Sequence, residues 1–246
     1  MVKLIVYITK TIVAILVALV VASCQYSIDL GDSIKGSGNI ISENRPVNGD
    51  FTSIEVSRGI DVIVTQSNIN SIEVKADDNI IEHILTDINN SVLTITLDKS
   101  VKNLSSKKVY VTLPNIESLR STSGSSISSK NTLVVKSIDV KSSSGSEINI
   151  DVEAEKIICE SSSGSEISVE GKAIKLEASS SSGSEIEAQN LLANDIIANS
   201  SSGSSIELHP IISLNAKASS GSDIIYFNNP KSLTKKSSSG GSIKSN

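Results

Sequence analysis

The chain has few of the side chains on which many enzymes and lectins depend. Only 2% of its 246 residues are aromatic, and none is tryptophan. Sugar-binding surfaces usually present exposed aromatic rings, so this shortage counts against a glycosidase and a lectin. The two histidines, His83 and His209, have no second histidine and no Cys-x-x-Cys pair nearby, so their spacing offers no zinc site. We expect both to be surface residues, and no Gly-x-Ser-x-Gly segment marks a nucleophilic serine.

Long apolar runs are absent except at the start of the chain. Lys3 and Lys10 precede an apolar run at 12–21, which is too short to span a membrane and is typical of an export signal. Residues 21–24, Val-Ala-Ser-Cys, resemble a bacterial lipobox, which implies cleavage before Cys24 and attachment of diacylglycerol to its sulfur. Several acyl chains together would hold the protein at a membrane. An uncleaved anchor and plain secretion are the alternatives.

Runs of basic residues are also absent. The formal net charge is −5, and loss of residues 1–23 removes two lysines, leaving 20 basic and 27 acidic residues, or −7. A mildly acidic chain without a basic cluster has no electrostatic footprint for nucleic acid. We therefore expect no nucleic-acid partner.

What the chain does have is a repeated phrase of small polar residues, a glycine and, three positions later, an isoleucine. Successive glycines of this phrase lie 21, 19, 19, 20, 18 and 19 residues apart. A period of this size indicates a repeat architecture, in which each unit buries its apolar face against its neighbours. The glycines are Gly124, Gly145, Gly164, Gly183, Gly203, Gly221 and Gly240.

Apolar residues alternate with polar ones on both sides of each glycine. Ile148 and Ile150 follow Gly145, for example, and Ile157 and Cys159 precede Gly164. This period of two predicts two short strands per repeat, with the glycine at a corner and inward-facing serines hydrogen-bonded between coils. A flexible Ser-Gly linker would carry no such apolar ladder.

The predicted fold is all-β: a single-stranded parallel β-helix, or β-solenoid, with about 19 residues per coil in the C-terminal half. The rule for parallel crossovers favours a right-handed coil. Cys159 occupies an inward position, so we expect a small core residue rather than a nucleophile. If Cys24 is lipidated, Cys159 has no partner for an intrachain disulfide.

Residues 36–119 alternate less regularly, which indicates longer, irregular coils of the same domain. Asp77, Asp78 and Asn79 could cap a short helix from Ile80 to about Thr86, since their side chains accept hydrogen bonds from first-turn amides. The expected organisation is therefore a lipoprotein signal peptide at 1–23, a tether at 24–35 and one domain at 36–246.

Glutamates recur at outward positions of the predicted coils. Stacked carboxylates about 4.8 Å apart repel each other by roughly 1 kcal/mol in water. Such a row could bind Ca²⁺ weakly through its carboxylate oxygens, or could simply be a solvated face. We expect no other cofactor. The possible acidic binding face consists of Glu147, Glu166, Glu185, Glu187 and Glu207.

Several phrases together resemble one family. They are Gly36-Ser-Gly-Asn-Ile, the segment from Arg45 to Val56, Arg58-Gly-Ile-Asp-Val and the later Ser-Gly-Ser-x-Ile series. This order is similar to that of the putative auto-transporter adhesin, head GIN domain family, over residues 36–246. The resemblance implies a β-helix-like fold in an exported protein or lipoprotein of Bacteroidota-type bacteria. It implies no catalytic residues.

Two functions follow as hypotheses. The first is a non-enzymatic, lipid-anchored module at the cell envelope, an outer-membrane lipoprotein facing the periplasm or the surface. It would contact the membrane through Cys24 and act as an adhesin-like or scaffold module that binds an envelope or host protein or glycan. The second is a carbohydrate-active protein, a polysaccharide lyase, a hydrolase or a glycan binder, that uses the acidic face around Glu166.

Overall fold

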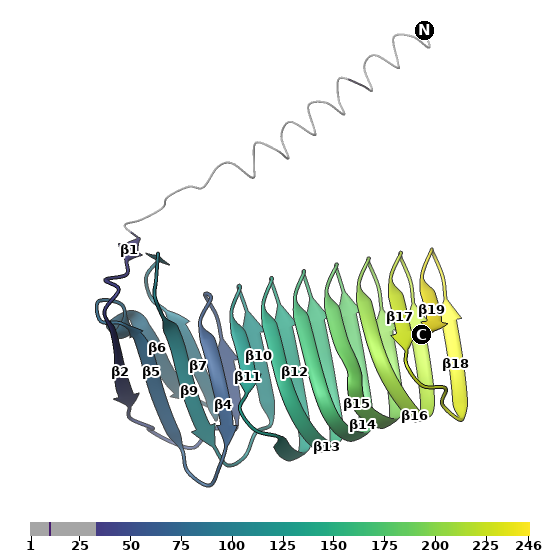
Figure 1. The fold of residues 1–246 in the computed structure, drawn as a ribbon, viewed down its shortest axis with the longest axis horizontal. Coiled ribbons are helices and arrows are strands. Elements are labelled where there is room, and N and C mark those ends of the chain that lie inside the picture. Colours follow the sequence, from purple (N-terminus) through teal and green to yellow (C-terminus); the bar gives the residue numbers. More distant parts are fainter. Residues whose placement is uncertain (1–9, 11–32) are drawn as a thin grey trace.

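The computed structural model describes Lys10 and residues 33–246 of the chain. Within this part, nineteen strands and a single 3₁₀ turn wind around one long axis (Figure 1). None of the described helices is long and apolar enough to cross a membrane. Cys24 and the expected signal peptide lie outside the described residues, so both stay predictions.

The C-terminal half is a stack of parallel coils, which confirms the predicted β-solenoid. Equivalent positions of successive repeats pair directly, as Ile148 does with Ile167 and Ile167 with Ile186. The strands are β10 (Ser118–Thr122), β11 (Ser126–Ser129), β12 (Leu133–Ser143), β13 (Glu147–Ser162), β14 (Glu166–Ser181), β15 (Glu185–Ser200), β16 (Ser205–Ala218), β17 (Asp223–Tyr226), β18 (Ser232–Ser237) and β19 (Ser242–Ser245).

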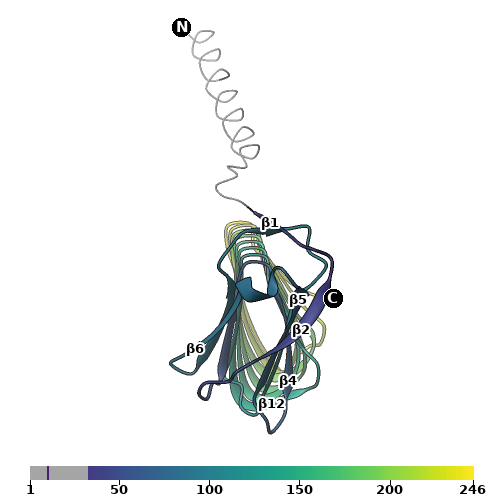
Figure 2. The same ribbon diagram turned by 90° about the vertical axis from the view of Figure 1, so that its left-hand side faces the viewer.

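The two short strands expected in each coil are joined in the middle coils. β13, β14 and β15 each continue for 16 residues around the edge opposite the Ser-Gly turn, because the parallel pairing persists through the bend. Each coil therefore contributes to two walls that face each other (Figure 2). We call the wall built from residues after each Ser-Gly turn wall A, and the wall built from residues before each turn wall B.

Apolar ladders from both walls fill the space between them. Ile167 of wall A and Leu176 of wall B are fully buried, and Cys159 lies in the same core. Burying one such aliphatic side chain contributes about 1.5–3 kcal/mol, so the repeated ladder supplies most of the driving force for stacking. The isoleucine ladder of wall A is Ile127, Ile148, Ile167, Ile186, Ile206 and Ile224.

Two buried serines per coil continue these ladders beside the turn. The hydroxyl of Ser165 lies 2.8 Å from the backbone carbonyl oxygen of Ser142 in the preceding coil, and it accepts a hydrogen bond from the backbone N–H of Ser162. Ser184 bonds to the carbonyl oxygen of Ser161 in the same way. Serine bonds between coils thus form as predicted, with backbone carbonyls as the acceptors. Their donor is the serine after each glycine, whereas Ser161, three residues before Gly164, donates to the carbonyl oxygen of Ser165 in its own coil.

The turn itself needs two residues in the left-handed region, not one. Ser163 has a φ of 56° and Gly164 a φ of 69°, and the same pair of values recurs in the other repeats. Positive φ at both central positions is the signature of a type I′ turn. Sequence reasoning assigned the glycine to the corner but missed the strained serine before it.

The N-terminal half caps the stack with a mixture of parallel and antiparallel strands. β3, β4 and β9 run parallel to the coils, whereas β5 pairs antiparallel with β2 and β9, and β6 pairs antiparallel with β7. β1 pairs with β8, so residues 34 and 35, expected in the tether, form a strand. The elements are β1 (Ile34–Lys35), β2 (Ile40–Arg45), β3 (Ser53–Val56), β4 (Asp61–Gln66), β5 (Ser71–Asp77), η1 (Ile81–His83), β6 (Ile84–Asn89), β7 (Val92–Leu97), β8 (Val101–Lys102) and β9 (Lys107–Leu113).

The prediction of a helix from Ile80 to about Thr86 is wrong. Only the 3₁₀ turn η1 forms there, and from Ile84 onward the chain pairs with β7 as a strand. Asp77 is buried and accepts hydrogen bonds from the backbone N–H groups of Ser105 and Ser106, so its carboxylate is not available as a helix cap. Tertiary pairing therefore decides the structure of this segment.

Candidate functional site

The predicted acidic residues do come together, on the outer surface of wall A. Glu147, Glu166 and Glu185 pair in register on adjacent strands, and Glu187 pairs with Glu207 two positions further along. Burial of the carboxyl, followed by repulsion from Glu187, Glu147 and Glu185, raises the pKa of Glu166. Burial and the charges of Glu187 and Glu185 likewise raise the pKa of Glu207.

These carboxylates do not converge on a point. Within the part of the chain that the structure describes, no group of three or more acidic, histidine or cysteine side chains is arranged to hold a metal ion. The residues are spread along a flat row because each strand contributes the same outward position. The expected weak Ca²⁺ site therefore gains no support from the geometry.

Neither histidine is the exposed surface residue that was expected. His83 is 9% exposed, and its Nδ1 lies 3.0 Å from a carboxylate oxygen of Asp98. Its place in η1, covered by the N-terminal cap, explains the burial. His209 is half-buried in β16, where Nδ1 lies 3.1 Å from the carbonyl oxygen of Gln189. Both histidines thus have structural partners.

Cys159 is the inert core residue that the sequence predicted. Its side chain is fully buried, and burial, with a smaller effect of the Asp139 charge, raises the pKa of the thiol to about 12. Because the thiolate is the nucleophilic form, a raised thiol pKa and full burial both disfavour a nucleophilic role for this cysteine at neutral pH.

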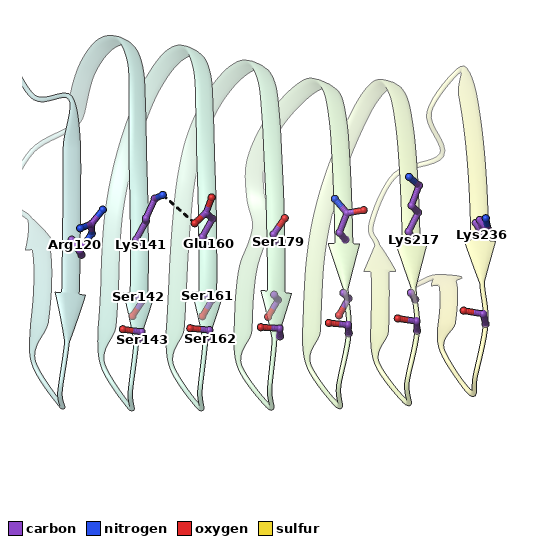
Figure 3. Close-up of a pocket in the computed structure, with 18 residues that line it drawn as sticks. Arg120, Lys141, Ser142, Ser143, Glu160, Ser161, Ser162, Ser179, Lys217 and Lys236 are labelled. Carbon is purple, nitrogen blue, oxygen red and sulfur yellow. Dashed lines mark ion pairs between the residues drawn. The ribbon is translucent and has the colours of Figure 1, made fainter.

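A long hollow of the solenoid lies on the opposite surface, along wall B. A groove of about 690 Å³ crosses the coils from β10 to β18 beside the Ser-Gly turns (Figure 3). Two outward rows line it. The row nearer the turns consists of serines, and Figure 3 shows their side chains at equivalent places in successive coils. This row is Ser143, Ser162, Ser181, Ser201, Ser219 and Ser238.

The second row of the groove contains most of its charge. Arg120 and Lys141 stand towards its N-terminal end, where Lys141 Nζ lies 3.1 Å from a carboxylate oxygen of Glu160 (Figure 3). Lys217 and Lys236 stand at the other end and form no ion pair with any residue of 33–246. Small residues occupy the middle of this row, which opens the groove there. The full row is Arg120, Lys141, Glu160, Ser179, Asn199, Lys217 and Lys236.

Sequence reasoning missed this groove. The serines three and one residues before each glycine were expected to face inward. Ser161 is buried as expected, but Ser163 is exposed in the turn, and Ser162 between them faces the groove. The available signal was the row four residues before each glycine, where lysine or arginine stands in four of seven coils. That row becomes visible only when the repeats are aligned and both outward faces are compared.

Comparison with known proteins now identifies the family. Residues 50–230 match the family described as "Putative auto-transporter adhesin, head GIN domain". The chain belongs to this family. The resemblance inferred from the phrases of the sequence is thereby confirmed. No match was found among curated proteins.

Solved structures of similar proteins have the same fold as this family member. A putative adhesin from Bacteroides fragilis is 23% identical with a TM-score of 0.81, over 87% of this chain and 100% of that chain. A putative adhesin from Parabacteroides merdae is 18% identical with a TM-score of 0.71, over 88% and 100%. A putative lipid binding protein from Parabacteroides distasonis is 18% identical with a TM-score of 0.70, over 87% and 100%. At these identities the likeness concerns the fold alone.

Proposed function

We propose that the protein is an exported, lipid-anchored module of the cell envelope that binds a partner and catalyses no reaction. Membership of a family described as auto-transporter adhesins supports export and a role in binding. The observation that carries the proposal is the uniform stack of coils, which presents two long ordered surfaces, the acidic rows and the groove, instead of a converging catalytic cluster.

The chemistry of the described side chains supports a binding role. A hydrolase needs a nucleophile or base brought to one point with a group that orients it. Here His83 and His209 bond to Asp98 and to the Gln189 carbonyl, and Cys159 is buried with a raised pKa. The two histidines thus have structural hydrogen-bond partners, and the cysteine thiol is held within the core.

Lipid anchoring rests on the lipobox-like residues 21–24. Cells expressing the full chain and fed an alkyne-labelled palmitate should incorporate the label into the protein, and Cys24→Ala should not. Equal labelling of both proteins, or labelling of neither, would contradict the anchor.

One observation favours a second candidate, a carbohydrate-active enzyme on wall A. Glu166 has a raised pKa and stands beside Glu147 and Glu185. A carboxyl kept protonated beside an ionised one is the arrangement that glycoside hydrolysis uses. The flat row argues against this candidate because it encloses no sugar and excludes no water.

A panel of envelope and host glycans separates the two candidates. The binding module predicts retention of some glycan or envelope protein without release of shorter products, and Glu166→Gln should leave that binding unchanged. The enzyme predicts shorter products that disappear in Glu166→Gln while the fold, followed by circular dichroism, is kept. Turnover of this kind would overturn the non-enzymatic proposal.

A further inference from the structure

The groove of wall B is a positively charged hollow on the outer surface of the coils. Arg120, Lys141, Lys217 and Lys236 supply four cations, while the whole chain has a net charge of −5. Arg120 is paired with Glu55 at 2.8 Å and Lys141 with Glu160 at 3.1 Å, so the excess positive charge of the groove lies on Lys217 and Lys236. An acidic protein that gathers cations into one groove, with its glutamate rows on the opposite wall, is electrostatically suited to an anionic ligand there.

The cations at the C-terminal end of the groove are available to such a ligand. Some lysines of the coils lie beside a carboxylate, as Lys156 and Lys175 do beside Glu177 at 3.1 and 2.7 Å. Lys217 and Lys236 are exposed, and within residues 33–246 neither forms an ion pair. Their charges are therefore directed outward.

The groove floor offers hydroxyl groups rather than apolar side chains. Ser143 donates to Thr122 at 3.1 Å, whereas Ser162, Ser181 and Ser201 take part in hydrogen bonds with other described residues through their backbone atoms and not through their hydroxyls. Each free hydroxyl can donate and accept, as sugar hydroxyls do. Coils about 4.8 Å apart repeat this group along the axis, so a linear ligand would meet the same donor and acceptor at every step.

The side chains that line the groove and the paired backbone of wall B also argue against several classes of ligand. A membrane surface would call for apolar side chains to insert, and none of the large exposed apolar residues lines the groove. Single-stranded nucleic acid would call for aromatic stacking platforms, and the lining has none. A polysaccharide in this groove would likewise meet no aromatic ring, so charge and hydroxyl contacts would have to hold it. A peptide could not add to the sheet here, because the backbone of wall B is already paired on both sides from β12 to β16.

We propose that the wall B groove binds a linear polysaccharide bearing carboxylate groups, with the serine row contacting sugar hydroxyls and Lys217 and Lys236 contacting carboxylates. The inference rests on the proposed binding function and gives it a site and a ligand class. It moves the glycan-binding surface from the acidic residues around Glu166 to the opposite wall.

Isothermal titration calorimetry of the full chain in detergent with polygalacturonate tests the proposal. The wild type should bind polygalacturonate, with an affinity that falls as salt is added, and should not bind neutral dextran. The double substitution Lys217→Gln/Lys236→Gln should weaken binding about tenfold, since two exposed charge contacts are lost. The matched control Lys75→Gln/Lys108→Gln removes the same charge from exposed positions outside the groove and should bind as the wild type does.

A charge reversal in the middle of the groove provides a second test. Ser179→Glu/Asn199→Glu places two carboxylates beside the floor at exposed positions, where the fold should be kept, and should abolish binding of polygalacturonate. Equal binding by the groove variants and the control would overturn the proposal. So would binding to dextran, or to phosphatidylglycerol vesicles in place of polygalacturonate. If the chain retains another envelope component independently of Lys217 and Lys236, the groove assignment fails while the binding function stands.

Discussion

At the residue scale, the same outward position has different consequences on the two walls. On wall A, burial of the carboxyl and, second to it, the like charges that stacking brings together raise the pKa of Glu166 and that of Glu207. On wall B, stacking places Lys141 beside Glu160 but leaves Lys217 without a carboxylate among the described residues. Equivalent positions of the coils stack in register, so each outward position forms a row. The charge next to one side chain therefore depends on the residue at that position in the neighbouring coil.

Glu166→Gln should stabilise the protein at pH 7. The folded state raises the pKa of Glu166 above its ordinary value of 4.5, so the carboxyl favours folding below that value and loses this contribution as pH rises through the folded pKa. Because Glu166 is only partly buried, solvent screens this cost, and its removal should gain about 0.5 kcal/mol and raise the Tm by about 1–2 °C for a chain of this size.

Thermal unfolding at two pH values checks this prediction. At a pH well below 4.5 the wild type and Glu166→Gln should unfold at the same temperature, because the carboxyl is protonated in both states. The control Glu155→Gln changes an exposed carboxyl away from the rows and should leave the Tm unchanged at either pH. A Tm that falls on Glu166→Gln would show that the carboxylate makes a stabilising contact instead.

Cys159 should resist alkylation as long as the protein is folded. Its side chain is fully buried and its thiol pKa is raised to about 12, so neither access nor thiolate is available. Mass spectrometry after iodoacetamide treatment should find Cys159 unmodified in the native protein and modified in denaturant. Rapid native modification would contradict its place in the core.

At the element scale, the Ser-Gly turn is the repeated unit that closes each coil. A Cβ added to Gly164 would contact nothing within 4 Å, so only its left-handed φ of 69° opposes a larger residue. Gly171 is different: with a φ of 114°, a Cβ there would lie 2.2 Å from the carbonyl oxygen of Val152. The first glycine is needed for its conformation, and the second for the close approach of two coils as well.

Gly171→Ala should therefore destabilise the protein more than Gly164→Ala does. We expect about 1 kcal/mol for Gly164→Ala from the left-handed backbone alone. Gly171→Ala should add about 1–3 kcal/mol for the displaced backbone. Urea unfolding of both variants measures the difference, and equal midpoints would show that the Val152 contact relaxes without cost.

The buried serine beside each turn also links neighbouring coils. Ser165→Ala removes the hydroxyl that joins the backbone of Ser162 to the carbonyl of Ser142, and should cost about 1–3 kcal/mol because buried groups lose their partner. Ser162→Ala removes an outward hydroxyl and serves as the control, with no expected loss in the same urea experiment. Equal stability of both variants would contradict the role of the inward serine.

The sequence was most informative where one residue type recurs at one distance from the glycine. The burial of Ile167 and Leu176 followed from the period of two, because each position faces the same wall in every coil. The N-terminal cap did not follow: the segment after Ile80 carries helix-compatible residues, and pairing with β7 overrides them. The groove did not follow either, since it depends on the side-chain sizes of adjacent coils.

At the scale of the whole molecule, the solenoid has two walls that face each other across one core, as Figure 2 shows. The acidic rows of wall A face one way, and the groove with Lys217 and Lys236 faces the other. A stack of this kind can present a ligand-binding groove along its full length without moving parts. For such a module to act at the envelope, it has to leave the cytoplasm and be retained.

The most direct test of this account is the location of the full chain in cells, with and without Cys24. Cells expressing the wild type or Cys24→Ala would be fractionated, and the fractions probed for the protein before and after protease treatment of intact cells and of cells with a permeabilised outer membrane. Wild-type protein should be found in the membrane fraction and should be cut by protease in one of the two preparations, whereas Cys24→Ala should be exported but released into the soluble fraction. Wild-type protein that stays in the cytoplasm and is protected in both preparations would contradict it.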